Sequence, residues 1–346
     1  MTAAATSLHG TVYHGVPLMR DPLATARSDS GSEAAALVTA ELDSVERRIE
    51  EVIRSREPRL TDIADYLINA GGKRVRPAVA MLVFRACGGA DIRDMVDLSV
   101  SLELIHTATL LHDDIIDSND VRRGRAAAPL RFGVADTLVT GDFLFSRAFE
   151  VCGRFEPQIV AWAADSCVQL TEGEIMQGRF RRNPAVGVTD YLEIINRKTA
   201  SLFAAGTKIA AYLAGMPDEG VTQMESCGRE IGLAFQMIDD ILDIEGDPRK
   251  IGKRVGTDLL DGNPSLPIVW GLDLAPVRRA FSASDCTERE IEDALRALRE
   301  GGILDRVREL AVEHARAAVT AVRGLRESPY RDALERLVRE LVQREI

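Results

Sequence analysis

The stretch LLHDDIIDSND, residues 110–120, decides the fold because it sets a pattern of carboxylates inside an otherwise apolar helical sequence. Asp113, Asp114 and Asp117 have the spacing D-D-x-x-D. Positions i and i+4 lie about 40° apart around an α-helix, so Asp113 and Asp117 share one helix face. Two carboxylates roughly 6 Å apart at an effective dielectric near ~20 repel each other by about 3 kcal/mol, which predicts a cation between them.

A second stretch, FQMIDDILDIEGD at residues 235–247, repeats this spacing with Asp239, Asp240 and Asp243. One acidic box is commonly a solvated helix face. Two boxes of the same spacing among Leu and Ile residues favour two half-buried helices that share a metal site. Carboxylate oxygens suit a hard divalent cation such as Mg²⁺, which keeps coordination positions open for phosphate oxygens.

The composition is that of a globular protein. The chain has 346 residues, of which 46% are hydrophobic, 28% charged and 5% aromatic. Its net charge of −11 argues against a nucleic-acid partner, which would need a basic surface. No apolar run approaches the ~18 residues that a membrane span requires. The five cysteines are dispersed without a C-x-x-C pair, so we expect reduced thiols and a cytoplasmic protein.

The sequence pattern divides the chain into a tail and one helical domain. Residues 1–30 are rich in Ala, Ser, Thr and Gly without periodicity, so we expect a flexible N-terminal tail that is not a secretory signal. Residues 31–346 are expected to form a single all-helical domain, because apolar residues recur with the helical period from about Glu33 onward. Thr61 is the expected N-cap of one early helix, and another is expected to start near Arg76–Pro77.

Longer helices follow from the same period. They are expected at residues 94–117, 135–154, 158–180, 190–213 and 219–244, with several shorter helices from residue 266 to the end. No segment alternates apolar and polar residues convincingly enough to predict a strand. The predicted fold class is therefore all-α, a single large bundle of antiparallel helices around one core.

Basic residues gather at places that suit a phosphate-bearing ligand. The loop GGKRVRP, residues 71–77, carries Lys73, Arg74 and Arg76 at a helix start, where free backbone N–H groups also favour an anion. A single basic residue would be expected to form a surface ion pair. Several basic residues associated with two acidic boxes instead favour diphosphate binding. The other basic positions near the boxes are Arg122, Arg123, Lys198 and Lys253.

Together these features resemble the trans-type isoprenyl diphosphate synthases of the polyprenyl synthetase family. The resemblance spans roughly residues 65–268, with the motifs in family order. It implies an isoprenoid synthase fold with a central apolar cavity, and a homodimer. The matching stretches are GGKRVRP (71–77), ELIHTATLLHDDIID (103–117), RRGR (122–125), GDFLF (141–145), RKTASLF (197–203), FQMIDDILDIEGD (235–247) and GKRVGTDLLDGNPSLP (252–267).

The resemblance also implies a magnesium site that binds the diphosphate of an allylic substrate. A cluster of about three Mg²⁺ ions is implied, and Mn²⁺ can replace them. Lys198 is implied as a catalytic residue beside the carboxylates, and Gln177 matches a family position near the metal. The implied metal ligands are Asp113, Asp114, Asp117, Asp239, Asp240 and Asp243, of which Asp113, Asp117 and Asp239 are the catalytic ones.

Two diphosphate-binding subsites follow from the same resemblance. His106 would ordinarily be expected as a hydrogen-bonded core histidine, but its position two helical turns before the first box, beside the basic loop, favours a ligand role. The expected contacts of the allylic diphosphate are Arg122, Lys198, Thr199, Gln236 and Lys253. The expected contacts of isopentenyl diphosphate are Lys73, Arg76, His106 and Arg123.

The implied reaction is a head-to-tail condensation that yields a linear all-trans polyprenyl diphosphate. Metal and basic residues stabilise the leaving diphosphate, so the allylic C–O bond ionises and the double bond of isopentenyl diphosphate attacks the cation. The departing diphosphate takes the proton, and apolar helices exclude water. A long product would be passed on to membrane enzymes.

The length of the product depends on the residues below the first box. Ala108 and Thr109 are small where short-chain members of the family often carry an aromatic stopper, and Ile105 lies one turn deeper. Because no aromatic side chain blocks the path at these positions, we expect a product of about thirty carbons or longer. Asn263 departs from the lysine of many relatives, and Ala126–Pro129 departs from their P-T-x-N.

Three alternatives stay open. A geranylgeranyl or farnesyl diphosphate synthase would make a shorter chain by the same reaction. A class I terpene cyclase usually replaces the second box with N-D-x-x-S-x-x-x-E and lacks the basic isopentenyl site. This chain keeps an intact second box and has the basic residues of that site. A partner-dependent subunit of a heteromeric prenyl synthase typically loses one or both boxes, and this chain keeps both.

Overall fold

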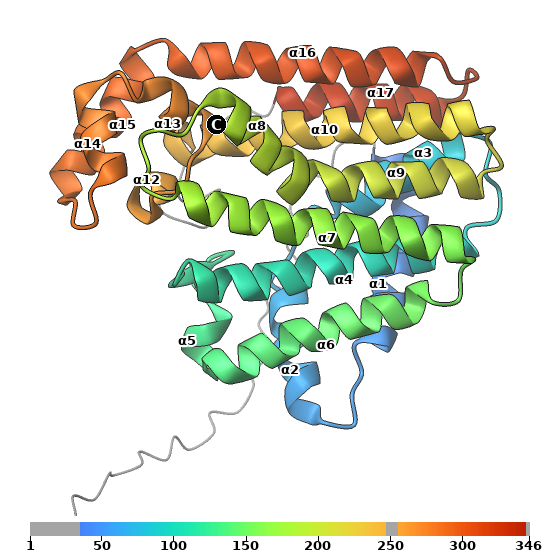
Figure 1. Ribbon diagram of the computed structural model, residues 1–346. Coiled ribbons are helices and arrows are strands. Elements are labelled where there is room, and N and C mark those ends of the chain that lie inside the picture. The colour runs from blue at the N-terminus through green and yellow to red at the C-terminus, as the bar shows by residue number, and fades with distance from the viewer. Residues whose placement is uncertain (1–34, 247–254, 344–346) are drawn as a thin grey trace, which may run out of the picture. The chain divides into compact units, whose positions relative to one another are not determined.

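The computed structural model describes residues 35–246 and 255–343, and these residues are almost entirely helical (Figure 1). The all-α prediction is confirmed. The predicted tail at residues 1–30 and the predicted ligand Lys253 lie outside the described residues. The predicted boundary between tail and domain therefore stays a prediction.

The described helices and strands follow one another in a simple order. The first half comprises the 3₁₀-helix η2 (Ala35–Val38), α1 (Thr39–Val52), α2 (Pro58–Ile68), α3 (Val75–Ala86), α4 (Arg93–Ile116), β1 (Val121–Arg122), β2 (Arg125–Ala126), α5 (Ala128–Phe132), α6 (Val134–Cys152) and α7 (Pro157–Phe180). The second half comprises α8 (Val188–Ile195), η3 (Asn196–Ala200), α9 (Ser201–Leu213), α10 (Asp218–Glu245), α12 (Thr257–Asp261), α13 (Leu266–Gly271), α14 (Ala275–Ser282), α15 (Glu288–Glu300), α16 (Ile303–Arg323) and α17 (Pro329–Val342).

The long helices α4, α6, α7 and α10 lie within a few residues of their predicted positions. The helix predicted at residues 190–213 is instead two helices, α8 and α9, joined by the π-helical turn η3. A π-helical turn widens the helix by one residue and often marks a functional site. This one carries Lys198 and Thr199.

Two local predictions need correction. Thr61 is not an N-cap, because α2 begins at Pro58 and the Glu57 carboxylate accepts the hydrogen bond from the Arg59 N–H at 3.3 Å. A short hairpin, β1–β2, is present although no strand was predicted. Arg123 and Gly124 form its turn with φ of 52° and 72°, the left-handed conformation of a type I′ turn. Strands of two residues are too short to show an alternating pattern.

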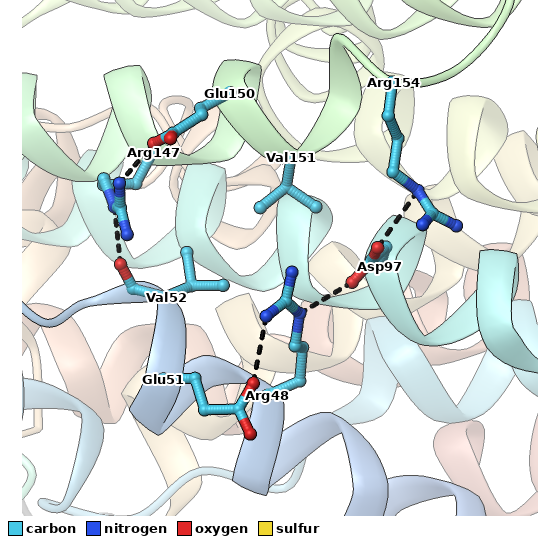
Figure 2. A pocket seen from close by; sticks show the side chains of 8 residues that line it. All are labelled: Arg48, Glu51, Val52, Asp97, Arg147, Glu150, Val151 and Arg154. Atoms are coloured by element: carbon cyan, nitrogen blue, oxygen red, sulfur yellow. Dashed lines mark hydrogen bonds and ion pairs between the residues drawn. The ribbon is translucent and has the colours of Figure 1, made fainter.

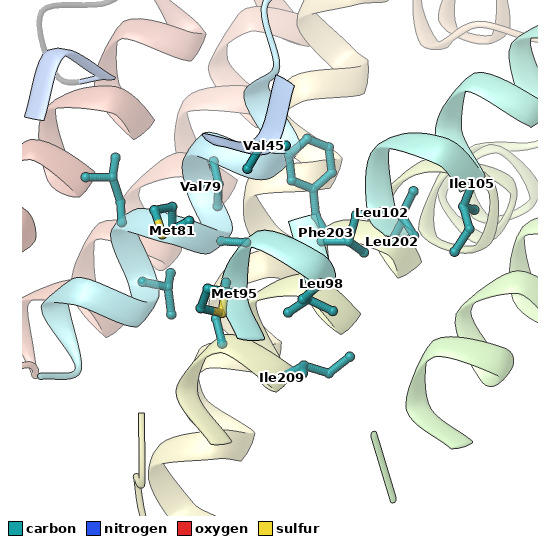
Figure 3. Close-up of a cluster of buried hydrophobic side chains, with 14 of the residues drawn as sticks. Val45, Val79, Met81, Met95, Leu98, Leu102, Ile105, Leu202, Phe203 and Ile209 are labelled. Atoms are coloured by element: carbon teal, nitrogen blue, oxygen red, sulfur yellow. The ribbon is translucent and has the colours of Figure 1, made fainter. Parts of the chain in front are cut away.

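The first part of the core surrounds α3, α4 and α9. Nine of the 12 residues of α3 are buried, which identifies a helix enclosed on most sides. Figure 3 shows Met81 of α3, Leu98 of α4 and Phe203 of α9 among the side chains of this cluster. The helix α4, whose C-terminal end carries the first acidic box, packs against α1, α3, α6 and α9.

The second part of the core lies under α12–α16, and α10 joins the two parts. Ile231 and Ala234 of α10 belong to the first cluster, whereas Met237 and Ile241 belong to the second. The second acidic box therefore lies where the two clusters meet. The contact of α10 with α9 is close, since a Cβ added to Gly228 would lie 2.1 Å from Thr207 Oγ1.

Candidate active site

A cleft of about 460 Å³ opens between the C-terminal end of α4, the β1–β2 hairpin, α7, η3, α10 and α12. Both acidic boxes reach it, so segments more than one hundred residues apart in sequence form its walls. Gln177, Asn263 and Tyr191 also line it. Twelve of the predicted site residues line the cleft: Arg76, His106, Thr109, Asp113, Asp117, Arg122, Arg123, Lys198, Thr199, Gln236, Asp239 and Asp240.

In the first acidic box, each carboxylate has its own cationic partner. Arg122 donates to Asp114 Oδ1 at 2.8 Å from Nε and 2.6 Å from Nη2. Lys198 Nζ lies 3.7 Å from Asp113 Oδ2. Arg181 forms an ion pair with Asp117. The cationic compensation that the D-D-x-x-D spacing predicts is thus supplied here by three side chains from β1, η3 and the end of α7.

Asp113 and Lys198 form the electrostatic centre of this wall. Burial raises the pKa of Asp113 to about 6, against the opposing effect of Lys198. Burial by itself lowers the pKa of Lys198, but Asp113 and Glu174 outweigh it and leave the net pKa raised. Lys198 therefore stays a cation at neutral pH. Glu174 of α7, which contacts Lys198 Nζ, was not predicted, because its position one turn before Gln177 shows no ligand pattern of its own.

In the second acidic box, Asp239 and Asp240 line the cleft, and Asp240 and Asp243 also accept hydrogen bonds from neighbouring elements. Asp240 is buried and accepts hydrogen bonds from Tyr191 Oη, Gln236 Nε2 and the Leu266 N–H at 2.7, 3.0 and 3.0 Å. Asp243 lies outside the cleft lining and accepts from Thr257 Oγ1 and the Asp258 N–H at the start of α12. Asp239 lines the cleft beside them.

A hydrogen-bonded chain connects η3 with the second box. The Thr199 hydroxyl donates to Gln236 Oε1 at 2.8 Å, and Gln236 in turn donates to Asp240. Burial raises the pKa of Asp240 to about 6, although its three hydrogen bonds oppose this. Burial and Asp240 also hold the pKa of Tyr191 well above its usual value, so Tyr191 remains a donor. The sequence pattern predicted no role for Tyr191, because its partner Asp240 lies on another helix.

A second group of cations lies on the α3 side of the cleft. The Arg76 guanidinium stacks on Phe203 at 4.9 Å from the ring centroid, and its Nε is buried without a hydrogen-bond partner in the described residues. Arg123 donates to the Leu67 carbonyl and lies against Gly72. Burial and the neighbouring arginines hold the pKa of His106 far below its ordinary value, so its imidazole is neutral.

The neighbouring residues of the basic loop point elsewhere. Arg74 is largely buried and makes ion pairs with Glu46 and Glu103 at 2.5 Å, so it holds α1, α3 and α4 together. Lys73 is exposed and does not line the cleft. The loop thus presents Arg76 to the cleft and uses Arg74 in the fold.

The apolar side chains of the cleft lining include Leu110, Leu170 and Phe235, and Thr109 also lines the cleft. The predicted chain-length residues Ala108 and Ile105 are 0% and 2% exposed and belong to the first core cluster, outside the cleft lining. Side chains below Thr109 must therefore move before a long chain can pass.

The carboxylates fit a divalent metal that binds together with a phosphate ligand. Within residues 35–246 and 255–343, no three Asp, Glu, His or Cys side chains lie close enough to enclose an ion by themselves. Asp113, Asp117 and Asp239 nevertheless line one cleft, and Asp114 Oδ2 is buried without a hydrogen-bond partner in the described residues. Because Mg²⁺ commonly takes one or two carboxylates, waters and substrate phosphates, this donor set is suitable.

A smaller cleft of about 220 Å³ lies between α1, α4 and α6 (Figure 2). Asp97 at its centre accepts from Arg48 Nε at 2.9 Å, and Arg154 Nε lies 3.0 Å from its other oxygen. These ion pairs join the three helices. The lining is mostly charged and internally paired, so it suits neither a prenyl chain nor a diphosphate.

Comparison with known proteins agrees with this geometry. Residues 57–298 match the polyprenyl synthetase family. The chain is 35% identical over 308 residues to the geranylgeranyl diphosphate synthase of Methanosarcina mazei, covering 87% of this chain and 95% of the relative. It is 34% identical over 315 residues to the octaprenyl diphosphate synthase of Escherichia coli, covering 89% and 97%.

Solved structures give the same result. The polyprenyl synthase from Caulobacter crescentus, crystallised with calcium and isoprenyl diphosphate, has a TM-score of 0.86 at 33% identity and covers 92% of this chain and 99% of its own. A decaprenyl diphosphate synthase from Rhodobacter capsulatus has a TM-score of 0.82 at 31% identity, covering 90% and 99%. The chain therefore belongs to the polyprenyl synthetase family and is a trans-prenyltransferase with the all-α isoprenoid synthase fold.

Proposed function

We propose that this protein condenses isopentenyl diphosphate with an allylic diphosphate to give a linear all-trans polyprenyl diphosphate of about thirty carbons or longer. One observation carries the proposal. Asp113, Asp117 and Asp239 share one cleft with Arg122 and Lys198, and a second cationic group lies across the same cleft. Two diphosphates and a divalent metal match this distribution of charge.

Mg²⁺ is the metal that the carboxylates suit best, and Mn²⁺ is the expected substitute. When bound with the substrate, the metal would neutralise charge that develops on the departing diphosphate. The carboxylates of both boxes would hold about three ions together with the diphosphate. The calcium and isoprenyl diphosphate in the Caulobacter crescentus structure are the same class of ligands, a divalent cation with a prenyl diphosphate.

The chain's own residues would divide the work. Arg122 and Lys198 would bind the allylic diphosphate and stabilise the charge left when its C–O bond breaks, with Lys253 as a further proposed contact. Thr199 and Gln236 would orient this end of the substrate through the hydrogen bonds that link them to Asp240. No cysteine or serine nucleophile is required for this reaction.

The second substrate would lie on the α3 side. Arg76 has an unpartnered Nε in the described residues, and Arg123 lies against Gly72, so both guanidinium groups face a common site for isopentenyl diphosphate. A neutral His106 would donate one N–H to it, and Lys73 would approach from the rim. Leu110, Leu170 and Phe235 would exclude water from the reacting carbons.

The product length depends on the region below Thr109. The small side chains of Ala108 and Thr109 leave no aromatic stopper at these two positions of α4. Replacing Ala108 with Phe is expected to shorten the product, because a ring in this buried position would block the growing chain. An unchanged distribution of product lengths would contradict this path.

A homodimer is proposed through the face of α6 and α7. Nine of the ten large apolar side chains that are exposed in the described residues lie in residues 116–175, including Val139 and Ile175 at 54% and 67% exposure. Val139→Glu is expected to give a monomer in analytical ultracentrifugation. Leu37→Glu, at a position 46% exposed elsewhere, serves as the control and should leave the dimer intact.

No helix in the described residues is long and apolar enough to cross a membrane. All five cysteines are free thiols, which suits the reducing cytoplasm that we propose as the location.

The decisive experiment incubates the purified protein with Mg²⁺, labelled isopentenyl diphosphate and each allylic primer in turn, and sizes the dephosphorylated products by mass. A ladder that ends at one long linear product supports the proposal. A ladder that ends at a geranylgeranyl or farnesyl chain would move the protein to a shorter product class. Cyclic hydrocarbon would indicate a terpene cyclase, and product only after addition of a second protein would indicate a heteromeric synthase.

A further inference from the structure

Arg181 is the one cation of the first acidic box that the sequence did not predict. It follows α7 directly and forms an ion pair with Asp117, 64 residues earlier in the chain. The side chains of Arg181 and Asp117 are 27% and 12% exposed, so the pair is largely withdrawn from solvent. In the described residues it is the only ion pair of Asp117.

The three cations of this box differ in what else they do. Arg122 and Lys198 line the cleft, where the proposed function assigns them to the diphosphate. Arg181 is not among the residues that line the cleft, and its Nε is buried without a hydrogen-bond partner in the part of the chain that the structure describes. A guanidinium that uses only part of its donor fork on one carboxylate retains donors for a second anion.

The backbone at this point is fixed by the next residue. Arg182 has a φ of 57°, its N–H donates to the Gly262 carbonyl at 2.9 Å, and its guanidinium donates to the carbonyls of Leu260 and Ala283. The α7 end is thus tied to the α12 side of the cleft. Because the anchor is at Arg182, the side chain of Arg181 is free to change its partner without moving the backbone.

We propose that Arg181 is a resident counter-ion of Asp117 which moves to the substrate diphosphate when a divalent metal binds Asp117. This inference rests on the proposed function. A metal ion and a guanidinium carry like charge, so they compete for one carboxylate. A diphosphate bound together with the metal would supply an alternative acceptor for Arg181.

The exchange couples the two ligands. Without diphosphate, a metal at Asp117 must displace Arg181 from its partner, so metal binding is weak. With diphosphate, the displaced guanidinium gains a new partner, so metal and diphosphate each increase the affinity for the other. Arg181 therefore acts as a positioning residue that lets the first box bind metal chiefly together with its substrate.

The test uses the full-length protein with Arg181 replaced by Ala or by Lys. Mn²⁺ binding without diphosphate is measured from the electron paramagnetic resonance signal of the free ion. Arg181→Ala should bind Mn²⁺ about tenfold more tightly than the wild type, whereas Arg181→Lys should remain close to the wild type because it keeps the charge. In saturating Mg²⁺, the Ala variant should bind inorganic pyrophosphate about tenfold more weakly by calorimetry.

Arg179→Ala is the matched control. Arg179 lies two residues earlier, is exposed, and contacts the ring of Phe180 rather than an acidic box. The substitution Arg179→Ala removes the same charge from the same segment. The affinities for Mn²⁺ and for pyrophosphate should therefore stay at their wild-type values. Circular dichroism confirms that each variant is folded before binding is measured.

Unchanged Mn²⁺ affinity in Arg181→Ala would overturn the exchange, and so would an equal change in Arg179→Ala. Weaker pyrophosphate binding with unchanged Mn²⁺ affinity would make Arg181 a simple diphosphate contact and also overturn it. Neither measurement needs turnover. If the wild type makes no prenyl product but the Mn²⁺ difference is found, the proposed function fails and the counter-ion role stands.

Discussion

The Tyr191 hydroxyl donates a 2.7 Å hydrogen bond to Asp240 Oδ2 inside the wall of the cleft, where Asp240 also accepts from Gln236 and the Leu266 N–H. A single buried carboxylate thereby joins α8, α10 and the start of α13. Asp240, the middle aspartate of the second box, thus holds the wall together, and Asp239 lines the cleft beside it.

Tyr191→Phe should therefore lower both stability and activity. The buried carboxylate loses one of three donors, which should lower the free energy of unfolding by about 1.5–3 kcal/mol. Gln236, which shares Asp240, should lose its fixed position, so kcat/KM should fall. Urea unfolding and steady-state kinetics measure the two effects. Tyr66→Phe is the control, since the exposed Tyr66 hydroxyl donates to the Ala126 carbonyl at 2.8 Å and its loss should cost well under 1 kcal/mol. Equal stability losses in both variants would contradict the assigned role of Asp240.

Two glycines of α7 allow a second matched comparison. A Cβ at Gly173 would lie 2.6 Å from the backbone nitrogen of Lys198, so Gly173→Ala must push α7 away from η3. Since a displacement of about 1 Å at a reacting group can cost about 100-fold in rate, kcat/KM should fall by about this factor. Gly178→Ala has no atom within 4 Å of its new methyl group and should leave activity unchanged while stabilising α7 by up to about 1 kcal/mol. Normal activity of Gly173→Ala would show that the position of Lys198 is not critical.

The same contact explains why the sequence could not predict the π-helical turn. The helical period of residues 190–213 is continuous, and it correctly predicts a helical segment. The interruption at Asn196–Ala200 coincides with the close approach of Gly173, which lies on a different helix. Propensity acts locally, whereas this turn is packed against a residue more than twenty positions earlier in the chain.

Local spacing predicted both acidic boxes and the helices that carry them, because period and charge pattern are contained within one segment. Local spacing could not show that, within one loop, Arg74 forms ion pairs in the fold whereas Arg76 lines the cleft. Arg74 meets Glu46 and Glu103, 28 and 29 residues away, and Arg76 meets Phe203. Arg181 was missed for the same reason, since its partner lies on another element. The residues that approach the boxes from a distance needed the structure.

The raised pKa of Asp113 predicts a conflict between stability and function. The pKa of Asp113 is about 6 in the folded state, against an ordinary value of 3.8. Between these two pH values the folded state binds more protons than the unfolded state. The free energy of unfolding therefore falls as the pH rises from the lower value to the higher one. In EDTA, Asp113→Asn should be more stable than the wild type by about 2 kcal/mol at pH 7.5, and the difference should shrink as the pH falls toward about 4. Prenyl transfer should be lost. Chemical unfolding at several pH values measures this, and a destabilised variant at pH 7.5 would show that the charged Asp113 is stabilising.

Arg74 and Lys73 are adjacent in the basic loop but should behave differently when replaced with Ala. Arg74→Ala leaves Glu103, whose side chain is 5% exposed, as an uncompensated buried charge, so the free energy of unfolding should fall by about 3–5 kcal/mol. Adding Glu103→Gln should restore part of this loss, because the stranded charge is removed. Lys73→Ala at the exposed position should leave stability within about 0.5 kcal/mol of the wild type and raise KM for isopentenyl diphosphate. Thermal and urea unfolding of the wild type, Arg74→Ala, Glu103→Gln and their double variant measures the cycle, with Lys73→Ala as the control. If Glu103→Gln restores nothing, the loss in Arg74→Ala comes from packing of the side chain rather than from its charge.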